Sequence, residues 1–133
     1  MMSRIRGRDT KPEVSLRKCL HRLGFRYRTH VGNLPGRPDI VFPKYQAAVF
    51  VHGCFWHRHA GCRFATNPSS NTEFWQTKFK GTLERDDAAI ARLEELGWRV
   101  AVVWECALER SQEAVARGVA RWLASQRKRL LLE

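Results

Sequence analysis

The spacing of apolar residues along the chain predicts three helices. Apolar residues recur at helical spacing in three segments: residues 11–23, 72–96 and 115–123. The first helix has a start signal, because Thr10 can cap it, Pro12 fits its first turn and Glu13 can bond back to the cap. Gly24 and Gly97 follow the first two helices and are expected to end them.

The apolar stripe of each helix is expected to face a core. In the long middle helix this stripe comprises Phe79, Leu83, Ile90 and Leu93. Cys19 lies on the apolar face of the first helix, where a small buried side chain is the expected role. Residues 125–133, after the last helix, are interpreted as a polar, basic tail, and residues 1–9 as a basic arm.

Apolar runs of strand length lie between the helices and predict four strands: residues 25–31, 39–42, 47–51 and 99–104. The run 47–51 is apolar on both faces, as expected of a central strand that is covered from both sides. The order α-β-β-β-α-β-α predicts a single α/β domain over residues 1–133, a sandwich with a small mixed sheet between helices. The irregular segment 52–71 is long for a compact domain, which favours a functional role.

The charge of the chain narrows its class of partner. Among 133 residues, 24 Lys and Arg stand against 13 Asp and Glu, a formal charge of +11. A folded domain this basic is typical of polyanion binding, the alternative being a basic protein without such a partner. The sequence has no apolar run near the roughly 20 residues of a membrane span and no signal peptide. We therefore predict a cytoplasmic location at the nucleoid, where the four cysteines are thiols or metal ligands.

Asp39 is the first candidate for metal chemistry. Pro38-Asp39 begins a predicted strand, where Mg2+ nucleases commonly hold their metal, although the pair is also an ordinary turn signal. The acidic-x-Lys triplet usual on the next strand is missing, and Phe50-Val51-His52 stands in its place. Either the chain has no catalytic site, or a histidine supplies the chemistry of the lysine.

A cluster of histidines and cysteines follows that strand. Cys54, His59 and Cys62 have the ligand types that Zn2+ prefers, and Cys106 offers a fourth. The alternative is a set of buried thiols and surface histidines. A four-ligand zinc site would leave the remaining histidines of the cluster, His52 and His57, free for catalysis.

Several aromatic residues lie in or near this segment. Phe55, Trp56 and Trp75 are interpreted as surfaces for stacking on bases or wedging between base steps. Core packing is instead expected for four others: Phe74, Trp98, Trp104 and Trp122.

Seven short motifs occur in order between about Ser3 and Leu108: Arg8-Asp9-Thr10-Lys11-Pro12-Glu13, Pro38-Asp39, His52-Gly53-Cys54-Phe55-Trp56-His57, Phe74-Trp75, Glu84-Arg85-Asp86, Gly97-Trp98-Arg99-Val100 and Trp104-Glu105-Cys106-Ala107-Leu108. In these motifs the chain resembles the very short patch repair (Vsr) DNA mismatch endonucleases. The resemblance implies a three-layer, restriction-endonuclease-like fold and a monomeric enzyme that nicks DNA 5′ to the thymine of a T:G mismatch. Such mismatches arise when 5-methylcytosine deaminates, so a cytosine-5 methyltransferase is the implied functional partner.

The resemblance also implies roles for single residues. Asp39 and the Val51 carbonyl would bind Mg2+, His57 would be the general base supported by His52, and Glu13 would contact water on the metal. The implied zinc ligands are Cys54, His59, Cys62 and Cys106. The implied DNA contacts are Phe55, Trp56 and Trp75 beside the mismatch, with the basic residues Arg4, Arg6, Arg8 and Lys11 on the duplex.

The chain departs from the family pattern at two positions. Val51 stands where a threonine can occur, which is compatible with a metal bound only by the backbone carbonyl. The spacing from His59 to Cys62 is one residue longer, which leaves His57 as an alternative zinc ligand. Other readings of the whole chain are a nuclease of the same fold with another lesion or site preference, a zinc-stabilised DNA-binding module without catalysis, and, more remotely, a thiol redox protein.

Overall fold

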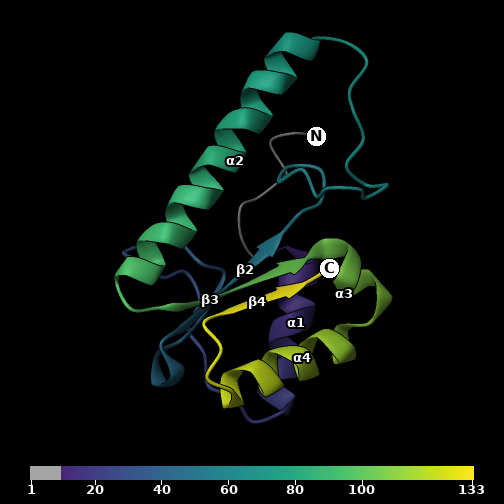
Figure 1. The fold of residues 1–133 in the computed structure, drawn as a ribbon. Coiled ribbons are helices and arrows are strands. Elements are labelled where there is room, and N and C mark those ends of the chain that lie inside the picture. Colours follow the sequence, from purple (N-terminus) through teal and green to yellow (C-terminus); the bar gives the residue numbers. More distant parts are fainter. Residues whose placement is uncertain (1–9) are drawn as a thin grey trace.

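The computed structural model describes residues 10–133, which form a four-stranded sheet with helices on both faces (Figure 1). The basic arm, with Arg4, Arg6 and Arg8, lies outside the described residues. The strands are β1 Ile40–Phe42, β2 Ala47–His52, β3 Arg99–Trp104 and β4 Arg129–Leu132, and they lie in this order across the sheet. β1 pairs with β2 antiparallel, whereas β2–β3 and β3–β4 are parallel, so the predicted mixed sheet is confirmed.

Alternate residues of β2 enter two separate cores. Ala47 and Val49 pack with α1 (Lys11–Arg22) and α4 (Gln112–Ala124) on one face of the sheet. Ala48 and Phe50 pack on the other face against Leu93 of α2 (Thr72–Glu95). β2 therefore is the central strand that its apolar pattern predicts, and the three-layer α/β architecture is confirmed.

The first helix begins as its sequence signals predict. The Thr10 hydroxyl accepts a hydrogen bond from the Glu13 amide at 3.4 Å, and Pro12 lies in the first turn. Cys19 is 4% exposed and belongs to the core, as expected. The side chain of Glu13 is also buried, which the capping pattern does not explain.

The C-terminal segment corrects one prediction. Residues 125–133 are not a tail, because residues 129–132 form β4 beside β3. The Arg99 guanidinium holds the turn before β4: it donates to the carbonyls of Trp122 and Ser125 at the end of α4 and to that of Arg127. Arg129 then forms a two-pronged ion pair with Glu94 of α2, at 2.6 and 2.7 Å.

The structure differs from the sequence-based expectations at three further points. Residues 25–31 form no strand and contribute a single bridge between Arg28 and Val41. A short helix, α3 (Glu105–Arg110), follows β3 directly and was not expected. Leu83 is 43% exposed and belongs to neither core cluster, whereas Phe79, one turn earlier on α2, is buried against Phe55 and Trp75.

Candidate active site and metal cluster

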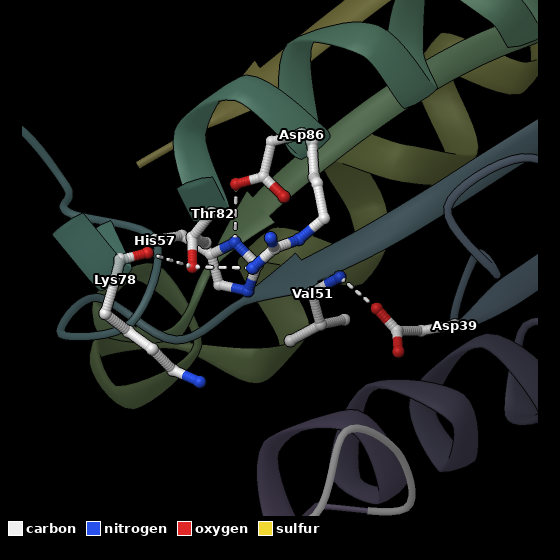
Figure 2. Close-up of polar contacts among 7 residues, drawn as sticks. Asp39, Val51, His57, Lys78, Thr82 and Asp86 are labelled. Carbon is white, nitrogen blue, oxygen red and sulfur yellow. Dashed lines mark hydrogen bonds and ion pairs between the residues drawn. The ribbon is translucent and has the colours of Figure 1, made fainter. Parts of the chain in front are cut away.

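Asp39 is held at the start of β1 by the neighbouring strand. Its amide donates to the Val49 carbonyl at 3.0 Å, and its Oδ2 accepts from the Val51 amide at 2.7 Å (Figure 2). Because the N–H and C=O of one residue in a strand point to the same edge, the Val51 carbonyl also faces the side of Asp39. The structure thus brings together the two groups expected to bind Mg2+.

A second carboxyl group lies next to Asp39. Burial and the nearby Glu13 carboxylate raise the pKa of Asp39 to about 8, although the Val51 amide opposes this shift. The Glu13 side chain is 3% exposed and its Oε2 lies 3.8 Å from Arg17 Nη1. Two buried carboxyl groups share one proton at neutral pH unless a cation compensates their charge. This pair therefore suits a hard divalent cation.

His57 is oriented by an acid on α2. Its Nδ1 lies 2.6 Å from Asp86 Oδ2, and Figure 2 shows the two side chains facing each other. A carboxylate on Nδ1 keeps the proton there, so Nε2 can accept a proton from water. Sequence reasoning quoted Asp86 within a family motif but gave it no role.

The His52 ring lies flat against the His57 ring. The ring centroids are 3.9 Å apart and the planes differ by 3°. Burial, followed by the positive charge that His57 can carry, lowers the pKa of His52 to about 4, so His52 is neutral at neutral pH. Although His52, His57 and Asp86 lie close enough to hold a metal, stacked imidazoles direct their lone pairs into parallel planes. The arrangement suits proton transfer better than coordination of one ion.

Asp39 and His57 line the same cleft. This cavity of about 240 Å³ is also lined by Val51, His52 and Asp86. In Figure 2 Val51 lies between the carboxylate and the histidine. A second hollow of about 600 Å³ adjoins it, because His57 and Asp86 line both.

The adjoining hollow is aromatic and basic. Its wall contains Trp56, Phe74 and Trp75 together with Lys78 and Arg85. Trp56 and Trp75 belong to one cluster of touching rings with Phe55 and Phe79. The expectation that Phe74 packs in the core is wrong, since its side chain is 60% exposed. Core packing is confirmed for Trp122, which is fully buried, and for Trp98, which is half-buried and packs against the core beneath α2, whereas Trp104 is half-buried.

Arg58 holds the aromatic cluster and its loop together. Its guanidinium lies 4.0 Å from the centre of the Phe79 ring and donates to the carbonyls of Phe55, Ala65 and Thr66. It also donates to the Asn67 side chain at 2.7 Å. Residues 53–71 contain no helix or strand, so the hydrogen bonds of this side chain add to the few backbone hydrogen bonds that hold the loop.

The four residues expected to bind zinc come together on the other side of the loop. The ligand atoms of Cys54, His59, Cys62 and Cys106 all lie within 4.8 Å of one another. His59 Nδ1 is 3.5 Å from Cys106 Sγ, close to the about 3.5 Å between tetrahedral nitrogen and sulfur ligands of Zn2+. Cys106 lies on α3 rather than on the strand before it.

The longer spacing before Cys62 is absorbed by a tight turn. The Cys62 amide donates to the His59 carbonyl at 3.2 Å, and Gly61 occupies the left-handed region with φ of 71°. Glycine tolerates this conformation at no steric cost. His59, not His57, therefore joins the cysteines, while His57 is engaged by Asp86.

Comparison with known proteins agrees with this geometry. Residues 1–63 match the family model described as DNA mismatch endonuclease Vsr. DNA mismatch endonuclease Vsr of Escherichia coli is 42% identical over 129 residues, covering 94% of this chain and 82% of the relative. The chain belongs to the Vsr family.

Two further relatives carry the name of nicking enzymes. Type II nicking enzyme V.XorIIP of Xanthomonas oryzae pv. oryzae is 47% identical over 108 residues, covering 81% of this chain and 79% of the relative. Type II nicking enzyme V.NmeAIP of Neisseria meningitidis is 47% identical over 109 residues, covering 82% and 77%. This Vsr-family protein is a DNA endonuclease, and a nuclease of this family implies a divalent metal.

Most of the predicted site residues lie close together in this Vsr-family chain. Asp39, Val51, His52 and His57 line one cleft, and Glu13 contacts Asp39 from α1. Lys11 is exposed at the start of the same helix. No helix in the described part of this Vsr-family chain is long and apolar enough to cross a bilayer.

Proposed function

We propose that this protein nicks one strand of duplex DNA 5′ to the thymine of a T:G mismatch, in a Mg2+-dependent reaction. The observation that carries the proposal is the placement of Asp39 and His57 in one cleft beside an aromatic, basic hollow. Hydrolysis of a phosphodiester needs stabilisation of the charge on the phosphate and activation of the attacking water. Asp39 would serve the first need by holding the metal, and His57 the second by accepting a proton.

Asp39 and the Val51 carbonyl would hold the Mg2+, with Glu13 on the neighbouring side. When bound, the ion stabilises negative charge on the scissile phosphate. The Val51 amide fixes one carboxylate oxygen of Asp39 at 2.7 Å, and the Glu13 carboxyl group hydrogen-bonds with the same side chain. Glu13, buried beside Arg17, would orient water next to Asp39.

His57 would take the proton from the attacking water. Asp86 keeps the His57 proton on Nδ1 and stabilises the imidazolium that forms. The neutral His52 ring supports His57 from one face without adding a second positive charge. The two histidines thus replace the lysine that many nucleases of this fold class carry on the second strand.

The aromatic cluster would recognise the mismatch. Trp56 and Trp75 line the hollow next to the cleft and Phe55 packs against both, so that this group of rings would wedge between base steps at the lesion. A mismatched step costs less to unstack than a paired one, which favours insertion there. Lys11, Lys78 and Arg85, with the basic arm, would neutralise phosphates.

The Cys54, His59, Cys62 and Cys106 cluster would hold a structural Zn2+. Burial raises the pKa of Cys54 to about 12, while the Phe64 amide lowers the pKa of Cys62 to about 7. A thiol as buried as Cys54 gives up its proton when a cation compensates the charge. The ion would tie the loop to α3.

The proposed function also implies a partner enzyme. A cytosine-5 methyltransferase that acts on the same nucleoid DNA would be the functional partner.

The test compares strand-specific cleavage of two duplexes of the same sequence, one with a T:G mismatch and one fully paired. We expect a Mg2+-dependent nick 5′ to the mismatched thymine in a T:G duplex and none in the paired control. Asp39→Asn should abolish the nick while DNA binding persists. Efficient nicking at another lesion or at an unmodified site would favour a different substrate. Binding without cleavage in several sequence contexts would favour a DNA-binding module.

A further inference from the structure

The last strand carries a carboxylate to the proposed zinc site. β4 pairs with β3 up to the match of Leu132 with Val103, so the next residue, Glu133, lies level with Trp104. The Trp104 ring stacks on the His59 imidazole, with centroids 4.2 Å apart and 9° between the planes. Glu133 Oε1 lies 2.6 Å from His59 Nε2. The register of the sheet therefore delivers this acid to the outer edge of the histidine.

The two ring nitrogens of His59 have different partners, a thiol and a carboxylate. Nδ1 faces Cys106 Sγ at 3.5 Å, whereas Nε2 faces the Glu133 carboxylate. A neutral imidazole carries one proton, and a carboxylate acceptor keeps that proton on Nε2. The lone pair of Nδ1 is then directed at the thiols, which is the tautomer that a metal in this cluster requires.

Glu133 is itself held in place from α3. Arg110, at the end of that helix, donates to the Glu133 backbone carbonyl at 2.5 Å. The Glu133 side chain is 51% exposed, whereas that of His59 is 9% exposed. Solvent weakens the charge interaction at this exposure, so orientation of the ring is the larger contribution.

We propose that Glu133 is a positioning residue of the metal cluster, which fixes the ring and tautomer of His59 and links β4 to metal binding. The inference rests on the proposed zinc site and extends it to a residue 74 positions away in the chain. Carboxylate partners of metal-bound histidines typically contribute about 10–100-fold to metal affinity. The C-terminal strand therefore contributes to the stability of the loop that carries His57.

Zinc release tests the inference. Zinc-loaded wild-type protein, Glu133→Ala and Glu133→Gln would be compared by transfer of zinc to the chromogenic chelator 4-(2-pyridylazo)resorcinol. We expect Glu133→Ala to lose about 10–100-fold in zinc affinity. Glu133→Gln keeps an acceptor oxygen but not the charge, so its affinity should lie between the two. Glu109→Gln is the matched control, because Glu109 lines the same cavity.

A spectrum separates positioning from general loosening. In Co2+-substituted protein, the d–d absorption bands of Glu133→Ala should shift, and those of Glu109→Gln should not. Unchanged zinc affinity and unchanged bands in Glu133→Ala, with faster amide exchange confined to β4, would overturn the inference. Wild-type protein that binds no zinc would instead remove the proposed zinc site itself, and the inference with it.

Discussion

Asp86 Oδ2 lies 2.6 Å from His57 Nδ1, and this contact joins the long helix to the loop after the central strand. The contact sets the tautomer of His57. Of the two histidines that line the cleft, His57 is the one with a carboxylate partner among the described hydrogen bonds. This geometry favours the tautomer of His57 that carries its proton on Nδ1 and leaves Nε2 available to water, beside a His52 ring that its lowered pKa of about 4 keeps neutral.

Replacing Asp86 by Asn should slow the chemical step with little effect on DNA binding. Asparagine fits the same space but can present its NH2 group to Nδ1, which favours the wrong tautomer of His57. We expect the single-turnover rate to fall by about 10²–10⁴-fold. Asp87→Asn is the control, because Asp87 is the next residue on α2 and is exposed. Equal rates for both variants would contradict the role given to Asp86.

Asp39→Asn should stabilise the Mg2+-free protein at high pH while abolishing cleavage. The pKa of Asp39 is about 8 in the folded protein, above its value of 3.8 in an ordinary environment. Between these values the folded state retains a proton that the unfolded state has lost, so stability falls as pH rises from about 4 to 8. The variant lacks this dependence and should be more stable near pH 8 by roughly 1–3 kcal/mol.

Urea unfolding in Mg2+-free buffer, with zinc retained, would measure this effect at pH 6 and pH 8. A related result is expected for the wild type with Mg2+. The metal must displace the Asp39 proton, so the Mg2+ concentration for half-maximal cleavage should fall as pH rises from 6 to 8. A Mg2+ requirement independent of pH in this range would show that Asp39 is already ionised.

The elements with local signals could be predicted from the sequence, and those that depend on distant partners could not. Thr10 and Pro12 mark the start of α1, and the doubly apolar run in β2 marks a central strand. β4 lacks such a signal, because it forms only where β3, Glu94 and the Arg99 contacts meet it. Residues 25–31 alternate like a strand, but the one β-bridge that they form within the described chain is to β1, which is only three residues long.

The same distinction holds within the site. The density of cysteine and histidine between Cys54 and Cys62 predicts metal ligands. The turn at Gly61 accommodates the one residue by which the spacing from His59 to Cys62 exceeds the family pattern. Asp86 and Glu133 are ordinary acids in the sequence. Their histidine partners lie 29 and 74 residues away, so only the folded chain reveals the pairing.

Arg58→Ala should loosen the loop and weaken DNA binding together. Arg58 makes four hydrogen bonds in the loop and lies over the Phe79 ring, while its own backbone is left-handed with φ of 53°. Alanine keeps the backbone strain and loses the bonds, at a cost of about 1–3 kcal/mol. Arg63→Ala, an exposed arginine of the same loop, controls for the lost charge. Thermal unfolding and salt-dependent DNA binding would separate the two variants.

Trp56→Ala should reduce discrimination between mismatched and paired DNA more than it reduces the chemical step. Trp56 contacts Phe55 and Trp75 and lines the hollow next to His57, but it makes no contact with Asp39 or Asp86 in the described hydrogen bonds and ring contacts. Loss of one stacking surface costs about 1–3 kcal/mol of binding, and this loss should fall on the T:G duplex. Trp56→Phe keeps a ring and should retain part of the preference. The measurement is the ratio of Kd values for paired and T:G duplexes beside the single-turnover rate at saturating DNA. A Trp56→Ala protein with an unchanged ratio and a slower cut would assign Trp56 to the chemistry instead of to recognition.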